Sequence, residues 1–325
     1  MIGKSSLFGL DATQKLLAFG SLIVLFIVFS LASPNFFQFS NIISIMLSTA
    51  VIGVLAVGVT FIIITGGIDL SIGTVMTFSS VIAGVFITFW KMPLFIGILG
   101  GLVAGAMCGF INGTVIAKLR IPPFIATLGM MMVTKGLSLV ISDTKPIYFT
   151  DSKIFSKIST GSVIGLVFPG VDIPNAVLIF FGVTIIASLL LTKTVLGRYN
   201  FAIGSNEEAV RLSGINVDAW KIAIYTLGGA FCGISGILMA ARLNSAQPAL
   251  GQGYELEAIA AVVIGGTSLS GGEGSVLGTF IGAFIMSVLT NGLRILSVKQ
   301  EWQTVVIGIV VIIAVYTDII RRRRV

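Results

Sequence analysis

The sequence predicts an all-α integral membrane protein with about ten transmembrane helices, some of them broken, and with both chain ends in the cytoplasm. Three observations predict this fold class: among 325 residues, 56% are hydrophobic, only 10% are charged, and the mean hydropathy is +1.08. A soluble domain carries about 25% charged residues. Apolar runs long enough to cross a bilayer, roughly 20 residues each, recur along the whole chain. Residues 1–325 are therefore expected to form a single transmembrane domain.

The expected helices follow the apolar runs in chain order. The run at 16–32 is longer than the roughly 7–15 apolar residues of a signal peptide, so it is interpreted as an uncleaved first helix. The segments near 72, 123 and 255 are short or interrupted by Gly, Ser, Thr or a charge, and some are expected to be broken or re-entrant. The ten expected segments are 16–32, 42–64, 72–90, 94–117, 123–142, 175–192, 222–240, 255–268, 275–293 and 302–319.

The distribution of Lys and Arg predicts the orientation. Ten crossings with both ends inside place most of the 20 basic residues in the cytoplasm, including the arginines at 321–324. This tail is interpreted as a stop-transfer anchor rather than a nucleic-acid contact. The connection at 143–174 is then outside the cell, where it is either a simple loop or a docking surface. The connection at 193–221 is cytoplasmic.

The residue types present argue against catalysis by this chain. It contains no histidine, which removes Ser-His pairs and the commonest metal ligand. Its two cysteines, Cys108 and Cys232, lie in apolar runs and are interpreted as packing residues. No GxxxxGK[ST] phosphate loop occurs, so ATP hydrolysis would need another subunit. We therefore expect no catalytic residue, no metal and no cofactor in this chain.

The polar stretch GSNEEAVRLSGIN at 204–216 predicts a short capped helix in the inner connection. Ser205 and Glu208 have capping-box spacing, and Glu207 and Glu208 lie where a helix N-terminus favours negative charge. Gly214 fits a left-handed C-terminal cap. The stretch is either an ordinary surface helix or a contact for another protein, and its specific capping favours the second interpretation.

A helix of about two turns is too short to be stable alone in water. Ala209, Val210 and Leu212 are therefore expected to pack against neighbouring elements. Glu207 and Arg211 have the spacing of an ion pair on the exposed face.

Several motifs resemble the ribose-type permeases of bacterial ABC importers, a family that also serves other monosaccharides and autoinducer-2. The resemblance rests on SPNFF, GGIDLSIG, PPFIATLGMMMV, LGRYNFAIGSNEEAVRLSGIN, SAQP and GYELEAIAAVVIGGTSLSGGEGSVLGTFIGA, which occur in the family's order along nearly the whole chain. It implies a cytoplasmic coupling helix that contacts an ATPase subunit, which binds ATP and Mg²⁺. It also implies an extracytoplasmic sugar-binding protein, a second permease copy and a place in the bacterial inner membrane.

On this resemblance, the helix from Asn206 to Ser213 transmits the motion of the ATPase, with Gly197 and Gly214 as bend points. The residues assigned to ATPase coupling are Gly197, Arg198, Ser205, Asn206, Glu207, Glu208, Arg211, Ser213 and Gly214.

Two glycine-rich breaks share the pattern GGxxLSxG, at 66–73 and 265–272. Transporters often place such discontinuities beside the substrate path. Asp69 in the first break is either a proton or sugar contact or, as we favour, a cap for the following helix. The amides of two asparagines could bind a sugar, although bonding between helices is the commoner use. The candidate pathway residues are Asp69, Asn112, Ser270 and Asn291.

Three other charged residues fall in or beside membrane segments. Lys135 is expected to reach the membrane surface or to pair, and Glu255 and Glu257 are expected at a helix entrance. The leading hypothesis is a sugar permease subunit, with ribose or a related sugar as substrate. The alternative is an ion- or proton-coupled secondary transporter, for which Asp69 is almost the only candidate group.

Overall fold

The computed structural model describes residues 4–322 apart from 151, 153, 169 and 171, so Lys153, Arg323 and Arg324 lie outside the described residues. Within the described part, a helix occurs at each of the ten expected segments. These helices are α1 (Lys4–Ala32), α2 (Phe39–Ile64), α3 (Ile72–Gly84), α4 (Leu94–Lys118), α5 (Pro123–Ile141), α8 (Asn175–Lys193), α11 (Val217–Leu243), α12 (Tyr254–Ile264), α13 (Val276–Ile295) and α14 (Gln300–Arg322). The fold class expected from the composition is confirmed.

The connections contain shorter elements. The loop after α5 carries β1 (Ile147–Tyr148), α6 (Lys157–Thr160) and α7 (Val163–Val167). The loop after α8 carries α9 (Val195–Ser205) and α10 (Glu207–Leu212), and β2 (Ser245–Ala246) follows α11. The helix α3 continues into one π-helical turn, η1 (Val85–Phe89).

Among the described residues, eight helices are long and apolar enough to cross a membrane. The apolar part of α1, Leu16–Ala32, is slightly shorter, and α12 has only 11 residues. At 1.5 Å per residue, α12 covers about 16 Å, roughly half of the hydrocarbon core. The non-helical chain before it, at Gly251, packs against Gly73 in the first turn of α3. The expected break is thus confirmed near 255, whereas α3 with η1 and α5 are continuous.

The helix α2 forms the centre of the bundle. Its most apolar window is 89% buried, and its sequence is hydrophobic on every side, which is typical of a helix surrounded by others. By contrast, the corresponding windows of α5 and α14 are only 17% and 11% buried. These two helices therefore present most of their surface to whatever surrounds a single copy of the chain.

A stripe of glycines brings α4 and α11 together. Gly101, Gly105, Gly109 and Gly113 recur every four residues in α4, on the side that faces α11. A methyl group on Gly105 or Gly109 would overlap backbone oxygens of α11. Small residues at this spacing let two membrane helices approach at backbone distance. This four-residue spacing is visible in the sequence, but on its own it does not tell which helix packs against it.

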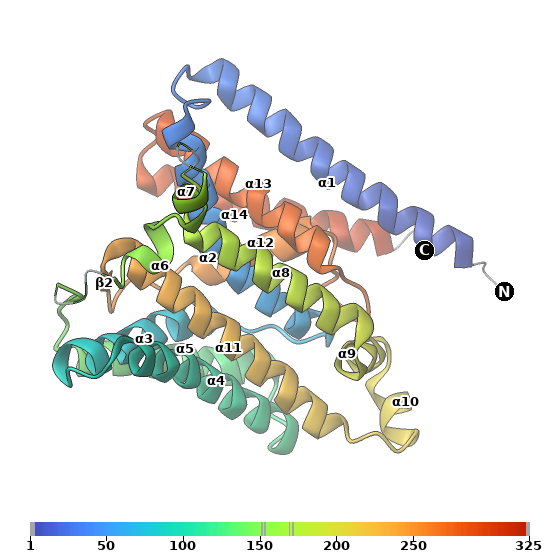
Figure 1. Cartoon of the computed structure of the whole chain (residues 1–325). Helices are drawn as coiled ribbons and strands as arrows, with labels where there is room; N and C mark the ends of the chain where they lie inside the picture. Colours follow the sequence, from blue (N-terminus) through green and yellow to red (C-terminus); the bar gives the residue numbers. More distant parts are fainter. Residues whose placement is uncertain (1–3, 151, 153, 169, 171, 323–325) are drawn as a thin grey trace.

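The helical bundle has two distinct ends. Figure 1 places α9 and α10 at the same end as the start of α1 and the end of α14, with β2, α6 and the connections around them at the other end. Basic residues of the predicted inner side, such as Lys118 and Lys193, end helices that reach the α10 end. This arrangement agrees with a chain whose two ends lie on the same side of the membrane.

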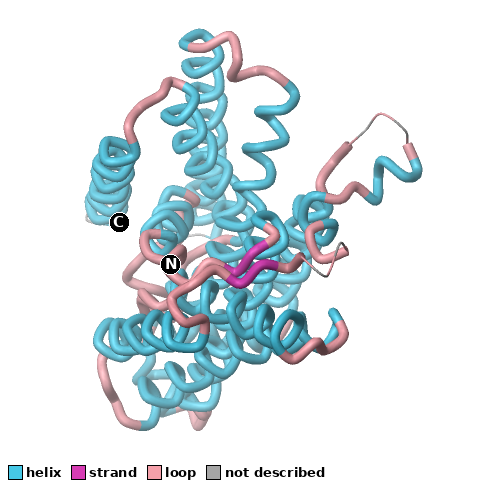
Figure 2. The backbone as a smooth tube through the Cα atoms, turned by 90° about the vertical axis from the view of Figure 1, so that its left-hand side faces the viewer, coloured by secondary structure: helices cyan, strands magenta, loops and turns pink. Residues whose placement is uncertain are grey.

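The loop at 143–174 is tied back to the bundle. Ile147 and Tyr148 pair antiparallel with Ala246 and Ser245. Figure 2 shows this ribbon in magenta, viewed from the side of the molecule that lies opposite α10 in Figure 1. Phe149 and Phe155 are buried, with ring centroids 4.0 Å apart. The first half of the loop is therefore a packed layer over α3 and α11, and its use as a docking surface remains a prediction.

Candidate functional site

The inner connection folds into two consecutive helices rather than one. The helix α9 begins immediately after Thr194, whose extended backbone (φ −107°, ψ 167°) turns the chain at the end of α8. Gly197 lies inside α9 and is buried, and a methyl group there would overlap the carbonyl oxygen of Leu191. The expectation that Gly197 is a bend point is therefore wrong, because the bend lies at Thr194 and Gly197 serves close packing. Arg198, one residue on, is exposed.

The cap of α10 is shifted by one residue from the expected position. The N-cap is Asn206, whose side chain accepts a hydrogen bond from the Ala209 amide at 2.9 Å. Ser205 is the last residue of α9, so Glu208 does not have the capping-box position relative to the true cap. Asn and Ser cap helices about equally well, and the extension of α9 to Ser205 decides between them.

The C-terminal end of α10 agrees with the sequence. Ser213 is the C-cap, its amide bonded to the carbonyl of Ala209 at 3.1 Å, and Gly214 follows with a φ of +83°. This left-handed conformation is one that glycine adopts without steric cost. The short helix is thus delimited by Asn206 and Gly214. The predicted left-handed cap at Gly214 is confirmed, and its use as a bend point stays a prediction.

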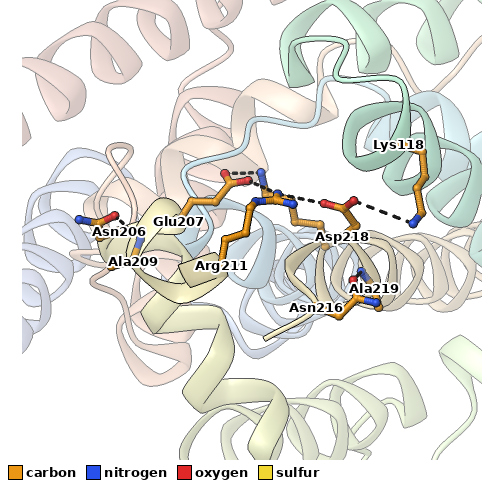
Figure 3. Close-up of polar contacts among 9 residues, drawn as sticks. Lys118, Asn206, Glu207, Ala209, Arg211, Asn216, Asp218 and Ala219 are labelled. Atoms are coloured by element: carbon orange, nitrogen blue, oxygen red, sulfur yellow. Dashed lines mark hydrogen bonds and ion pairs between the residues drawn. The ribbon is translucent and has the colours of Figure 1, made fainter. Parts of the chain in front are cut away.

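An ionic network fastens α10 to its neighbours. Glu207 pairs with Arg211 at 3.1 Å, as expected, and also receives a 2.6 Å hydrogen bond from Lys221 in α11. Arg211 donates to Asp218 at 3.0 Å, and Lys118 at the end of α4 lies 3.9 Å from the same carboxylate. Figure 3 shows these side chains converging from three helices. Sequence reasoning missed Lys118, Asp218 and Lys221, because their partners lie on other elements.

The charges in this network shift one another's titration. Partial burial by itself would raise the pKa of Glu207, but hydrogen bonds and positive charge from Lys221 and Arg211 outweigh it, so the pKa of this carboxyl lies below its ordinary value. Glu207 and Arg211 are each more than a third exposed, and solvent weakens such pairs. The network therefore positions α10 more than it stabilises the whole fold.

The apolar side chains of α10 do not share one face. Val210 is buried with Ile203 and Val217, as expected. Leu212 is 83% exposed and Ala209 is exposed as well, so the expectation that all three pack against the bundle is wrong for these two. The ionic network occupies the side toward α11. An exposed leucine beside the exposed Glu208 is therefore left on the surface of the α10 end.

The two glycine-rich breaks meet each other and the end of α9. The Gly272 amide donates to the carbonyl of Ile64 at 2.9 Å. A methyl group on Gly271 would lie 2.8 Å from the Gly66 nitrogen and 2.9 Å from the Gly204 oxygen, and one on Gly204 would overlap the Ile64 carbonyl. We call Ile64, Gly66, Gly204, Gly271 and Gly272 the glycine junction. Segments about 200 residues apart thus meet through backbone contacts, directly beside α10.

Asp69 and Asn112 form a buried polar cluster around Ser71. Asp69 accepts hydrogen bonds from the Ser71 amide at 2.8 Å and the Ser71 hydroxyl at 2.6 Å, and Asn112 donates to that hydroxyl at 3.0 Å. The N-cap of α3 is Ser71, so the expectation that Asp69 itself caps the helix is corrected. Asp69 instead stabilises the turn that leads into α3.

The other two candidate pathway residues lie elsewhere. Ser270 belongs to the turn at the glycine junction, where its amide donates to Ser268 at 3.4 Å. Asn291 donates to Asn41 at 2.9 Å and so links α13 to α2, the helix-to-helix use favoured from the sequence. The four residues predicted for the pathway are therefore not brought together in one site.

Lys135 and Glu255 have the kinds of contact expected for them. Lys135 in α5 donates to the amide oxygen of Gln252 at 2.9 Å. Glu255 lies in the first turn of α12 and accepts from the Gly253 amide at 3.0 Å.

Comparison with known proteins places the chain. Residues 41–315 match the family described as "Branched-chain amino acid transport system / permease component". The chain belongs to this permease family. It is 40% identical over 301 residues to the ribose import permease protein RbsC of Escherichia coli (strain K12), covering 92% of this chain and 91% of the relative. The permease is thus a multi-pass inner-membrane protein.

Two further relatives are informative. The permease is 44% identical over 306 residues to RbsC of Bacillus subtilis (strain 168), covering 94% of this chain and 92% of the relative. It is 37% identical over 290 residues to the fructose import permease protein FrcC of Rhizobium meliloti, covering 87% and 79%. The family description names amino acids, whereas these relatives are named for sugars. No solved structure matches the permease significantly.

Proposed function

We propose that the chain is the membrane-spanning permease subunit of an ATP-driven importer that brings a monosaccharide, ribose or a close relative of it, into a bacterial cell. The observation that carries this proposal is the identity of about two residues in five to ribose import permeases over more than nine-tenths of both chains. The matched region, 41–315, includes α10 and both glycine-rich breaks. This match thus covers the membrane helices from α2 to most of α14 together with the inner connection.

The energy would come from a separate ATPase subunit, which binds ATP and Mg²⁺. The chain has no GxxxxGK[ST] loop of its own. The segment from Asn206 to Gly214 is a protruding, capped helix with Leu212 and Glu208 on its outer surface. An exposed apolar side chain rimmed by polar ones is typical of a protein contact. We propose that this surface of α10 inserts into the ATPase.

Two sets of contacts support a mechanical role for α10. The ionic network connects Glu207 and Arg211 to α11, so a push on α10 would move α11 as well. Through Gly204, the end of α9 contacts the end of α2 at Ile64 and the second glycine-rich break, which in turn contacts the first break at Gly66. The closing motion of the ATPase would thereby be transmitted to α2, α3, α12 and α13 through backbone contacts, which deform less than contacts between flexible side chains.

The remaining partners follow from the same proposal. An extracytoplasmic binding protein would deliver the sugar to the end of the bundle opposite α10. A second permease copy and lipid would cover the exposed surfaces of α5 and α14. The route of the sugar through the permease is expected to bind the sugar weakly, since tight binding would slow its release.

A proton- or ion-coupled mechanism has less support. Asp69, the main candidate group, already accepts two hydrogen bonds from Ser71 and lies in a turn that these bonds stabilise. A relay group would need to exchange its proton with water or substrate.

Uptake by reconstituted protein tests the proposal. The permease is placed in liposomes with its ATPase and binding protein, and entry of radiolabelled D-ribose is measured with and without internal ATP. We expect uptake only when all three proteins and ATP are present. Uptake driven by a proton or sodium gradient in liposomes that contain the permease alone would overturn the proposal.

A further inference from the structure

A polar cavity of about 200 Å³ lies among α2, α11, α12, α13 and α14. Four helix ends meet there: the last turns of α11 and α13 and the first turns of α12 and α14. These ends lie toward the end of the bundle that carries β2, away from α10. The polar and charged side chains that line the cavity include those of Arg242, Tyr254, Glu257, Arg294, Gln300 and Gln303.

The three charged side chains in this cavity lie near enough for their charges to interact, but none of them is fixed by a hydrogen bond or a salt bridge in the described part of the chain. Within the described part of the chain, Arg242, Glu257 and Arg294 make no side-chain hydrogen bond and no salt bridge, although Arg242 and Glu257 are half-buried. A charged group withdrawn from water is costly unless it is paired. In a membrane protein such groups face aqueous cavities and mark substrate paths. Their donor and acceptor capacity is therefore available to a solute.

The lining also indicates what kind of solute fits. Two guanidinium groups donate hydrogen bonds, the Glu257 carboxylate accepts them, and Gln300 contributes an amide that does both. Every hydroxyl of a sugar is likewise a donor and an acceptor. The ring of Tyr254 and the side chain of Leu250 supply apolar surface for C–H groups. A phosphate or carboxylate ligand would be attracted by the two guanidinium groups but would leave the Glu257 carboxylate without a donor, whereas a neutral polyol can bond to all three charged groups.

The volume agrees with a small ligand. About 200 Å³ is less than the roughly 300–1,000 Å³ of pockets for drug-sized molecules. At about 30 Å³ per water molecule, it equals the space of about six or seven water molecules, which a monosaccharide would displace.

We propose that this cavity is a weak binding site for a neutral monosaccharide, held by Arg242, Glu257 and Arg294 on its way through the permease. The proposal rests on the proposed function, because it takes a sugar as the transported solute. It moves the substrate contacts away from Asp69, Asn112 and Asn291, which bond to other parts of the protein. It also assigns Glu257 a role as the hydrogen-bond acceptor of the site.

Protection from a thiol reagent tests this site. Gln300 is exposed at the cavity, so Gln300→Cys gives a thiol whose labelling a bound sugar would block. The native Cys108 and Cys232 are buried, at 5% and 2% exposure, and give little background. Membranes that contain the permease alone are labelled with a maleimide in the presence of D-ribose. We expect labelling to slow about tenfold when ribose is about ten times its Kd.

Matched variants separate the site from its surroundings. Lys299→Cys, next along the chain but outside the cavity lining, is expected to label at the same rate with or without ribose. Adding Glu257→Gln or Arg294→Gln to Gln300→Cys should abolish the protection, which is measured for each variant as the ratio of its own labelling rates without and with ribose. Protection that survives both changes would overturn the assigned roles.

The cavity proposal would be overturned if labelling of Gln300→Cys did not slow up to about 100 mM ribose, because that excludes a Kd well below this value. It would also be overturned if ribose slowed the labelling of Lys299→Cys equally, or if inorganic phosphate protected Gln300→Cys better than ribose does. The labelling needs no ATPase, so it is independent of coupling. If the native protein takes up ribose in an ATP-dependent way but ribose does not protect the thiol of Gln300→Cys, only the cavity proposal is refuted. Absence of that uptake would count against the proposed function.

Discussion

At the scale of single residues, the inner connection divides its side chains between two tasks. Glu207, Arg211 and Val210 face the bundle, whereas Leu212 and Glu208 face outward. The side chains of the first group contact other residues of this chain, and those of the second group do not take part in these contacts. Substitutions in the two groups should therefore have different consequences.

Leu212→Ser should weaken binding to the ATPase without unfolding the permease. The side chain is 83% exposed, so the fold loses almost no packing. If Leu212 enters a pocket of the partner, its truncation should cost about 1–2 kcal/mol, or about tenfold in affinity. Co-purification of the ATPase and ribose uptake measure the effect. The matched control is Leu119→Ser, 65% exposed just beyond α4, and an equal loss in both variants would contradict the prediction.

Glu207 should make the docking of α10 sensitive to acid but not to changes near neutrality. Because the pKa of Glu207 is lower in the folded than in the unfolded chain, its ion pairs contribute fully above the ordinary pKa of about 4.3 and are lost as the pH falls through the lowered value. Amide hydrogen exchange in α10, corrected for intrinsic rates, should keep constant protection from about pH 5 to 8 and lose it below about pH 4.

A substitution gives the same contrast at neutral pH. Glu207→Gln should speed exchange in α10 about fivefold or less, because the half-exposed pairs are worth about 1 kcal/mol together. Glu208→Gln, the exposed neighbour, should change little. Equal exchange in both variants would show that the network does not hold α10.

At the scale of elements, backbone contacts join parts of the chain that side chains would otherwise separate. The glycine stripe brings α4 onto α11, and the glycine junction brings α9 onto the end of α2 and the second glycine-rich break. Close-packed surfaces of this kind leave no space for one additional methyl group.

Gly204→Ala should damage the glycine junction. The new methyl group would overlap the Ile64 carbonyl and approach the Gly272 nitrogen, so the contact must open, at a cost of about 1–3 kcal/mol. We expect a lower Tm in detergent and reduced ribose uptake per inserted molecule. Gly182→Ala in α8, where no atom lies within 4 Å of the added methyl, is the control. An unchanged Tm and uptake for Gly204→Ala would refute a role for this contact.

At the scale of the whole molecule, the two ends of the bundle differ in structure. One end carries α10 and the ionic network, and the other carries the β1–β2 ribbon and the cavity. Transport across a membrane requires that these ends face different compartments.

Cysteine labelling tests that orientation. Ser213→Cys, at the end of α10, and Leu166→Cys, 84% exposed in α7, lie at opposite ends of the bundle. An impermeant maleimide should label Leu166→Cys from outside and Ser213→Cys only after the membrane is opened to the cytoplasmic side. Labelling of Ser213→Cys from outside would invert the topology.

Local chemistry made much of this protein predictable. In lipid, a helix makes all its backbone hydrogen bonds within one segment, and a continuous apolar run lacks the alternation of a barrel strand. The ten helical segments could therefore be recognised in order. The left-handed Gly214 and the Glu207–Arg211 pair were also predictable, because both depend on residues within a few positions of each other. The family resemblance came from motifs spread along the whole chain.

Contacts between distant segments were decided only by the tertiary structure. Which of Ser205 and Asn206 caps α10 depends on where α9 ends, and the partners of Arg211 and Glu207 include Asp218 and Lys221 in another helix. The contact of Gly66 with Gly271 has no local signature in the sequence, and neither has the gathering of Arg242, Glu257 and Arg294 in one cavity. The sequence by itself therefore determined the helices, the fold class and the family. Packing decided which polar residues hold the protein together and which remain available to a partner or a sugar, because that depends on what lies opposite each side chain.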